Sequence, residues 1–378
     1  MDFSFAKTSI DEVVSIAQEV VSTKNIGSVL SSILIKAEEN SIFVKATDLK
    51  IYYEAQIPVK VLETGIAAIY CNKFIEILNS FSLTEEIEFL QKEYEEDEND
   101  NLLKTTIRSV EGKINFQVKN IPYKKFPDFY FEDDIPFFEI DSKKIKEMIA
   151  QTLFAVSIEE ARYFMNGVFF EKKENNLNLV ATDGRRLSFI SKPILENAKD
   201  FPSVIVHPKI LNIILKYAPN EGNIFIAIVE KKFFCKFSNY KFSAALLEGQ
   251  FPNYTRVIPK KQSFIFYVKK TDLTNALDKR ISLMLDKKTG RIFFDIAQGN
   301  LNISSSQDNV GTVKEEIPCK FVGNPVTIAF NFSYIGEPLK EISTETIAFE
   351  FTEEMKAVTM RPDPAQDYFH IIMPMQKE

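Results

Sequence analysis

The sequence predicts an α+β fold made of three like modules, each with two helices packed on antiparallel sheets. Three observations predict it. An apolar strand leads into an amphipathic helix three times, a second amphipathic helix follows in each third, and the segments between them alternate apolar with polar residues. About eight strands per module account for this alternation. A third of 378 residues exceeds the roughly 20–50 residues of solenoid repeats, so each module is large enough to bury its own core.

The first module opens on a short strand in which Phe3 and Phe5 alternate with polar neighbours. A helix is predicted to follow from Ser9, because Glu12 stands at capping-box spacing from it. Apolar residues then recur at helical spacing, at Val13, Ile16, Ala17, Val20 and Val21. The strand is therefore expected to pass directly into a helix.

The other two modules open in the same way. Apolar and polar residues alternate from Phe138 to Asp141, the predicted N-cap of a helix. They alternate again from Phe264 towards Thr271, which stands at the predicted start of the corresponding helix. Proline and charge interrupt the periodic segments near residues 133–136 and 259–263. We therefore expect domains over residues 1–134, 135–260 and 261–378. An ordinary three-domain protein without functional symmetry is the alternative.

A second helix is predicted in each module, in CNKFIEILNSF from Cys71, HPKILNIILKYA from His207 and NFSYIGEPLKEI from Asn331. Pro208 suits the first helical position of the middle helix, where a missing N–H costs nothing. Pro338 lies inside the last helix, and an internal proline costs about 3 kcal/mol. We expect that helix to kink or to begin later.

One strand sequence also recurs. We align SIFVKATDLKI from Ser41, NLNLVATDGRRLSFI from Asn176 and RIFFDIAQGNLNI from Arg291, of which the first two share Ala-Thr-Asp. In the first module, the acidic stretch at residues 93–100 is flanked by strand-like segments. It is predicted to be a solvated hairpin tip, with a regulatory role as the alternative.

The composition is typical of a globular protein. Hydrophobic residues make up 45% and charged residues 26%, and no apolar run approaches the roughly 18 residues of a membrane helix. Asp2 stands where a secretory signal would be basic, and the three cysteines are odd in number and scattered, at Cys71, Cys235 and Cys319. We expect a cytoplasmic protein whose cysteines are small core residues.

Catalytic and metal-binding signatures are mostly missing, so no cofactor is expected. His207 and His370 are the two histidines, neither beside a serine or cysteine nucleophile in sequence, and no P-loop occurs. Asp183 and Arg186, within TDGRR, could hold a phosphate ester in an enzyme. The same residues also suit a turn, because Asp-Gly is favoured between strands, and Asp48 has the matching place in the first module without arginines.

Four segments resemble the bacterial replicative sliding clamp, the beta subunit of DNA polymerase III. They are RYFMNGVFFE from Arg162, ATDGRRLS from Ala181, EGQFPNYTRVIP from Glu248 and IIMPMQ from Ile371, in this order. The similarity extends over essentially the whole chain, including its three-part plan. The four motifs are specific as a set, whereas each alone is weak.

The resemblance implies a ring and a non-catalytic function as a DNA polymerase processivity factor. Two crescent-shaped chains would meet head to tail around duplex DNA, with helices lining the hole, and sheets closed across domains would hide strand edges. The implied partners are a second copy of the chain, double-stranded DNA of any sequence, the replicative DNA polymerase, the clamp loader and other proteins with clamp-binding motifs. A phosphoester-processing enzyme and a scaffold without DNA are the alternatives.

The net charge of −7 argues against a protein that grips DNA, because phosphate neutralisation by Lys and Arg supplies most nonspecific affinity. Basic residues nevertheless lie on or beside predicted helices, at Lys143, Lys144, Lys146, Lys209, Lys216, Lys269, Lys270, Lys279 and Arg280. They would steer DNA, although a solvated helix face is the alternative for each. Matched to the family, the DNA-binding residues would be Lys24, Lys73, Tyr163, Phe164 and Lys209.

The family also binds short peptides, which carry a glutamine and apolar or aromatic anchors, in a cleft between the second and third domains. The resemblance places the deep part of this pocket at Met165, Thr182, Gly184, Arg185, Arg186, Leu187, Pro252, Val257, Ile371 and Met373. The shallower part would be Tyr163, Asn331, Tyr334, Met355, Pro374 and Met375. Apolar walls favour binding at roughly 25 cal/mol per Å², and a few polar groups orient the peptide.

The chain departs from the family pattern at three places. Arg185 replaces the histidine often found there and adds charge to the pocket. The chain ends Gln376-Lys377-Glu378 where a basic and then apolar finish is common, and Pro208-Lys209 stands where a basic pair is common. We therefore expect the partner preference, the pocket rim and the DNA contact to differ from those common in the family.

Four residues are candidates for the seam of the implied ring, the interface at which its two chains would meet. Phe116 and Val118 match apolar positions of a first-domain edge strand that meets the third domain of the other subunit. Leu283 and the nearby Ile281 are the counterpart in the third domain. Ordinary core positions are the alternative for each.

Overall fold

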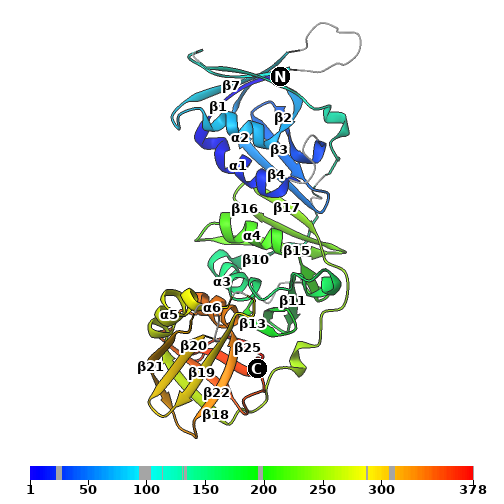
Figure 1. Cartoon of the computed structure of the whole chain (residues 1–378). Helices are drawn as coiled ribbons and strands as arrows, with labels where there is room; N and C mark the ends of the chain where they lie inside the picture. Colours follow the sequence, from blue (N-terminus) through cyan, green and yellow to red (C-terminus); the bar gives the residue numbers. More distant parts are fainter. Residues whose placement is uncertain are drawn as a thin grey trace. The chain divides into compact units, whose positions relative to one another are not determined.

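The computed structural model describes residues 1–22, 28–92, 104–112, 114–129, 131, 134–194, 199–286, 288–305 and 311–377. The chain forms two compact units, whose elements Figure 1 labels. The first consists chiefly of residues 1–143 and 212–246, and the second of residues 144–194, 200–211 and 247–377. The middle module is therefore divided between the two units.

The elements follow the predicted modules. The first contains β1 (Asp2–Ala6), α1 (Lys7–Val20), η1 (Val29–Ser31), β2 (Ser32–Glu38), β3 (Ser41–Thr47), β4 (Ile51–Pro58), β5 (Lys60–Glu63), β6 (Gly65–Tyr70), α2 (Cys71–Asn79), β7 (Glu86–Lys92), β8 (Lys104–Ser109), β9 (Asn115–Lys119) and η2 (Tyr123–Lys125). The second contains β10 (Phe138–Asp141), α3 (Ser142–Leu153), η3 (Glu160–Met165), β11 (Val168–Lys173), β12 (Asn176–Thr182), β13 (Arg186–Pro193), β14 (Val204–Val206), α4 (Pro208–Tyr217), β15 (Asn223–Val229), β16 (Lys232–Phe237), β17 (Tyr240–Ala245) and η4 (Tyr254–Arg256). The third contains β18 (Phe264–Lys269), α5 (Lys270–Lys279), η5 (Ile281–Met284), β19 (Arg291–Ala297), β20 (Asn300–Ser305), β21 (Lys314–Phe321), β22 (Val326–Asn331), α6 (Phe332–Glu341), β23 (Thr346–Phe351), β24 (Val358–Asp363) and β25 (Tyr368–Ile372).

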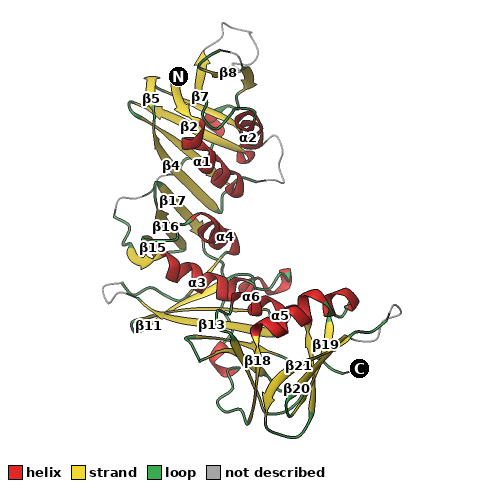
Figure 2. Cartoon of the chain, turned by 90° about the vertical axis from the view of Figure 1, so that its left-hand side faces the viewer, coloured by secondary structure: helices red, strands yellow, loops and turns green. Residues whose placement is uncertain are grey.

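The strand order repeats from module to module. It is β1-β7-β8-β9 and β4-β3-β2-β6 in the first, β10-β15-β16-β17 and β13-β12-β11-β14 in the second, and β18-β23-β24-β25 and β21-β20-β19-β22 in the third. The end of β21 pairs with β18 in the third module, as β5 pairs with β1 in the first. Figure 2 shows α5 and α6 on one face of the strands of the third module. The predicted α+β class and its threefold repeat are confirmed.

Neighbouring modules are joined by strand pairing. The last strand of the second module, β17, pairs with β4 of the first, and Tyr240 lies opposite Ala55. The last strand of the third module, β25, pairs in the same way with β13 of the second, and Leu187 lies opposite Ile371. β4 and β13 have equivalent places in their modules, so one rule of pairing is used twice: the last strand of a module pairs with this strand of the module before it. Each pairing covers a strand edge that would otherwise be open.

Two of the predicted helix starts are wrong. α1 begins at Lys7, and the Ser9 hydroxyl donates to the Ala6 carbonyl at 2.7 Å, so no capping box forms. α5 begins at Lys270, one residue before Thr271, and has no side-chain cap. In both cases strand pairing extends to the residue before the helix, so the sheet fixes where the helix begins and a capping side chain is not needed.

Two other helices begin where the sequence predicts. α4 begins at Pro208, and α3 begins directly after Asp141. The expected interruption of α6 is wrong, because the helix runs through Pro338 and is capped by the Asn331 side chain. Pro338 is buried, so the packing of its ring offsets the single intrahelical hydrogen bond that it cannot donate.

The alignment of the third module is wrong by one strand. RIFFDIAQGNLNI forms β19 and β20, whereas SIFVKAT and NLNLVAT form β3 and β12. β20 is the true counterpart, because it lies between β19 and β21 as β3 lies between β2 and β4. Alternation cannot distinguish successive strands of a meander, since all of them have the same period.

The cores consist of apolar side chains from alternate strand positions. Cys71, Cys235 and Cys319 are buried free thiols, as expected. Aromatic rings stack in the sheets, as Phe266 does on Phe349 with 4.8 Å between ring centroids. No helix in the described part of the chain is long and apolar enough to cross a membrane.

His370 is a polar residue within this core. Its Nδ1 lies 3.0 Å from the Ser188 hydroxyl, and its buried Nε2 has no hydrogen-bond partner among the described residues. Burial, together with the positive charge of Arg186, lowers the pKa of His370 to about 3. The imidazole is therefore neutral in the folded protein at physiological pH.

This neutral imidazole predicts a loss of stability in mild acid. An unfolded imidazole titrates near pH 6.5, so between about pH 6.5 and pH 3 only the unfolded state binds the proton, and stability falls as the pH falls. From pH 7 to pH 5 the loss through His370 should be about 2 kcal/mol. Urea unfolding of the native protein and of His370→Asn at both pH values measures it. Equal pH-dependent losses in the two proteins would contradict the prediction.

Candidate peptide-binding site

Residues 182–186 form a tight turn between β12 and β13. The Asp183 carboxylate accepts the backbone N–H groups of Arg185 at 2.8 Å and Arg186 at 3.0 Å. Gly184 has a φ of +88°, which glycine adopts without steric cost. The Thr182 hydroxyl donates to the Arg186 carbonyl at 2.5 Å and accepts the Gly184 N–H at 3.0 Å. The interpretation of TDGRR as a turn is confirmed.

The first module contains the same turn without arginines. The Asp48 carboxylate accepts the N–H groups of Lys50 at 2.9 Å and Ile51 at 2.7 Å, and the Thr47 hydroxyl donates to the Ile51 carbonyl at 2.8 Å. The threonine and aspartate are therefore sufficient for the turn. Arg186 must have a different role in the second module.

Arg186 connects this turn to the third module. Its side chain is only 10% exposed, its Nε lies 3.1 Å from Asp183, and its Nη1 pairs with Glu337 of α6. Its Nη2 donates to the Phe154 carbonyl at 2.6 Å, and the guanidinium lies 4.7 Å from the centre of the Tyr334 ring. All three nitrogen atoms have partners inside the second unit. Arg186 therefore holds the turn of residues 182–186 against the third module.

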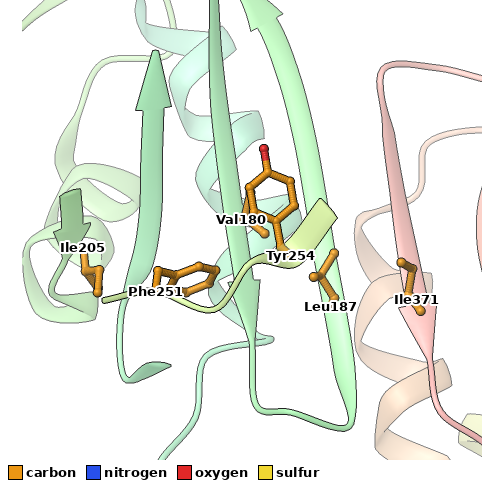
Figure 3. Close-up of a cluster of buried hydrophobic side chains, with 6 residues drawn as sticks. All are labelled: Val180, Leu187, Ile205, Phe251, Tyr254 and Ile371. Atoms are coloured by element: carbon orange, nitrogen blue, oxygen red, sulfur yellow. The ribbon is translucent and has the colours of Figure 1, made fainter. Parts of the chain in front are cut away.

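An apolar floor lies beside the turn (Figure 3). It is a cluster of buried side chains from β12, β13, β14, β25 and the segment after β17, comprising Val180, Leu187, Ile205, Phe251, Tyr254 and Ile371. Leu187 and Ile371 are direct cross-strand neighbours, each 3% exposed. The pairing of β13 with β25 thus brings together two predicted pocket residues from different modules.

The C-terminal segment runs along the edge of this floor. The Met373 N–H donates to the Arg185 carbonyl at 2.9 Å, and the Met375 N–H donates to the Ala329 carbonyl at 2.8 Å. Pro374 lies between the two tied residues. Met373 is 42% exposed, so its thioether is available at the surface while its backbone is fixed.

Tyr163 and Phe164 lie in η3, and Phe164 packs against the floor. Tyr163 is 54% exposed, whereas Phe164 is half-buried against the cluster in Figure 3. Gly249 permits this approach, because its φ is +108° and a Cβ there would lie 2.9 Å from the Phe164 Cβ. Met165 follows them and is 5% exposed.

The remaining pocket candidates have different surroundings. Val257 and Met355 are about half-exposed, and Pro252 follows Phe251 of the floor. Asn331 caps α6 through its side chain, which accepts the Ser333 N–H at 2.9 Å. Every predicted pocket residue belongs to the second unit. Glu378, at the end of the divergent tail, lies outside the described residues.

The predicted DNA-binding lysines are not brought together in one unit. Lys73 of α2 belongs to the first unit, where its ammonium pairs with Glu76. Lys209 is the second residue of α4, and its N–H donates to the His207 Nδ1 at 3.0 Å. Lys24 lies outside the described residues, as does the acidic stretch at residues 93–100.

The seam candidates divide into exposed and buried positions. Phe116 and Val118 are half-buried in β9, which is an edge strand, and Phe116 contacts Phe81 edge-on at 5.9 Å. Leu283 is 76% exposed, but Ile281 is fully buried in its own unit. The prediction of Ile281 as an interface residue is therefore wrong, because the turn of η5 directs Ile281 inward and leaves Leu283 at the surface.

Some residues of the candidate site were not predicted from the sequence. Phe251 and Tyr254 form much of the floor, and both stand within EGQFPNYTRVIP, so that motif contained the signal. Glu337 and Phe154 hold Arg186 but lie far from it in sequence, so no local pattern could identify them. Within the described ranges, no group of His, Cys, Asp and Glu side chains is arranged to hold a metal ion.

Comparison with known proteins assigns the chain to a family. Family models described as the N-terminal, central and C-terminal domains of the DNA polymerase III beta subunit match residues 1–129, 139–253 and 255–376. The beta sliding clamp of Treponema pallidum is 38% identical over 369 residues, which cover 97% of this chain and 96% of the relative. That of Staphylococcus epidermidis is 27% identical over 391 residues, which cover 100% and 99%.

Solved structures show the same fold. The DNA polymerase III subunit beta of Pseudomonas aeruginosa aligns over 100% of both chains with a TM-score of 0.88 at 23% identity. A sliding clamp from Bartonella birtlesii bound to griselimycin aligns over 100% of both chains with a TM-score of 0.90 at 24% identity. With all three domain models matched, the chain belongs to the DNA polymerase III beta subunit family, and its function is that of a sliding clamp, a DNA polymerase processivity factor.

Proposed function

We propose that two copies of this chain close head to tail into a ring around duplex DNA of any sequence. The ring tethers the replicative polymerase, the clamp loader and other motif-bearing proteins through the pocket on the second unit. The observation that carries this proposal is the rule of strand pairing between modules, because it leaves one open edge at each end of the repeat.

The two open edges occupy equivalent places in the rule. β4 and β13 each pair with the last strand of the following module, and β21 is the equivalent strand of the third module. Among the described residues, Lys314–Pro318 of β21 pair only with β20. β9, the last strand of the first module, pairs only with β8 among the described strands. Continuing the rule pairs β9 of one copy with β21 of the other.

The open edges also match in length. β9 spans Asn115–Lys119, as many residues as Lys314–Pro318. Each copy has one edge of each kind, so the contact is head to tail, and only a closed ring pairs both of these edges in every copy. A dimer is the ring size that the family resemblance implies.

Enclosure explains how an acidic protein can stay on DNA. The net charge of −7 disfavours tight binding to the phosphate backbone. Helices nevertheless carry cations, including Lys73 on α2, Lys209 on α4 and Lys279 on α5. Such charges would steer DNA through the hole without holding it, so that the ring slides.

The pocket suits a short peptide with apolar anchors. Leu187 and Ile371 supply an apolar floor, and Met373 supplies a flexible, polarisable wall beside it. Arg185 is exposed at the rim and adds a positive charge. Partial burial of apolar anchors with a few polar contacts is the usual composition of such sites.

The same proposal covers domain organisation and chemistry. Domains over residues 1–134, 135–260 and 261–378 are supported by the strand order, which restarts at β10 and again at β18. We place the protein in the cytoplasm and assign it a non-catalytic role. The contacts of Asp183 and Arg186 support the non-catalytic role, because their polar atoms are used by the turn and by α6. A phosphoester-processing enzyme would need these groups free for a substrate.

Phe116→Asp is predicted to convert the dimer into a monomer. The new charge would lie on the partly exposed apolar side of β9, where pairing with another chain would have to desolvate it. Sedimentation equilibrium measures the change in mass, with circular dichroism to confirm folding. Gln117→Asp, which adds the same charge to the opposite face of β9, should leave the dimer largely intact. An unchanged mass for Phe116→Asp would refute this seam.

Met373→Ala is predicted to weaken binding of a synthetic clamp-binding peptide by about tenfold. The truncation removes apolar contact beside the floor, which is worth about 1–2 kcal/mol for a half-exposed side chain. Fluorescence anisotropy with a labelled peptide measures the affinity. Met284→Ala is the matched control, because Met284 is similarly exposed, at 40%, but lies in η5 of the third module. Equal affinities of Met373→Ala and the native protein would count against the pocket.

A further inference from the structure

A second recess, of about 370 Å³, lies on the same unit as the peptide pocket, and the proposed function does not use it. Its walls come from three places in the chain. These are Lys173, Glu174, Asn176 and Asn178 of the β11–β12 hairpin, Phe189 and Ser191 of β13, and Tyr254, Thr255 and Ile258 of the segment after β17. The lining thus combines three apolar or aromatic side chains with two charged side chains and four amide or hydroxyl groups.

The second recess lies on the same sheet face as the pocket floor. Leu187, Phe189 and Ser191 alternate along β13, so all three side chains project from one face. Lys192 projects from the other face, where its ammonium lies 3.1 Å from Glu147 of α3. Leu187 belongs to the floor, and Ser191 lines the second recess. These positions are four residues apart along the strand, or about 13 Å.

The segment of residues 254–258 crosses this face between the pocket and the second recess. The Tyr254 ring lies 5.9 Å from the Phe189 ring, and Figure 3 shows Tyr254 over the strands that carry Val180 and Leu187. Val257 in the same segment is 54% exposed. The crossing separates the two hollows and exposes Thr255 and Arg256 as well as Val257.

The walls of the second recess are held in place by hydrogen bonds. The Tyr254 hydroxyl donates to the Glu171 carboxylate at 2.5 Å, and the Asn178 amide donates to the same oxygen at 3.1 Å. The Ser191 N–H donates to the Asp367 carbonyl at 3.0 Å, which fixes its strand against the third module. A ligand would therefore meet a preformed surface, which reduces the entropy lost on binding.

We propose that the second recess binds the residues that flank the clamp-binding motif in the same partner chain. One apolar side chain of the flank packs against Phe189, Tyr254 and Ile258, while its main chain faces the polar groups of Asn176 and Ser191. An extended chain anchored at Leu187 reaches Ser191 in about four residues, at about 3.3 Å per residue. The inference rests on the proposed peptide pocket and extends it to a longer recognition element.

A display library tests the proposal without assuming which flank binds. The probe is the clamp-binding motif held fixed, with six randomised residues on each side, and the bait is the full-length chain. The native protein should select an apolar residue about four positions from one end of the motif. A selected flank should raise affinity about tenfold over the motif alone, as partial burial of one apolar side chain would.

Ser191→Arg fills the second recess without touching the pocket floor. It should abolish selection in the flank and the tenfold gain, while the motif alone binds as to the native protein. Ser203→Arg is the matched control, because Ser203 is exposed in the same unit but lines neither hollow, and it should preserve the flank selection.

The outcomes separate this inference from the proposed function. If the motif alone does not bind the native protein, the peptide pocket itself is wrong. If the motif binds but no flanking residue is selected, the second recess has no role in recognition. Flank selection that persists unchanged in Ser191→Arg would likewise overturn the inference.

Discussion

Main-chain hydrogen bonding at strand edges is the constraint on which this structure depends. A module whose sheets end in unpaired N–H and C=O groups would be prone to association through those edges. The pairing of β17 with β4 and of β25 with β13 satisfies two such edges within the chain. The pairing of β9 with β21 between copies would satisfy two more. The same interaction therefore joins modules and, in our proposal, closes the ring.

In our proposal, the peptide pocket is a consequence of this pairing. Leu187 and Ile371 become neighbours because β13 pairs with β25, and the chain end is held beside them by main-chain bonds to Arg185 and Ala329. Arg186 strengthens the same contact by joining the turn to Glu337. A site assembled from two modules in this way would lose its floor if the pairing opened. Binding a partner should in turn stabilise the pairing.

Much of the fold could be predicted from the sequence, because strands and helices have different periods. Local patterns predicted Pro208 at a helix start and the turn at Asp183, where nearby residues decide the conformation. They failed where the sheet decides, as at the capless start of α1, and where packing offsets a local cost, as at Pro338. Ile281 was misjudged because burial depends on distant elements that no local period encodes. For the pocket, only the resemblance to a family could bring together residues 163 and 373.

Enclosure is the central claim, since the weak grip expected of an acidic chain requires another means of staying on DNA. The most direct measurement loads the protein with a clamp loader onto a closed circular plasmid and onto the same plasmid after linearisation, and follows retention after free protein is removed. The account predicts long retention on the circle and rapid loss from the free ends of the linear form, with little dependence on sequence. Equal retention on both forms would contradict it.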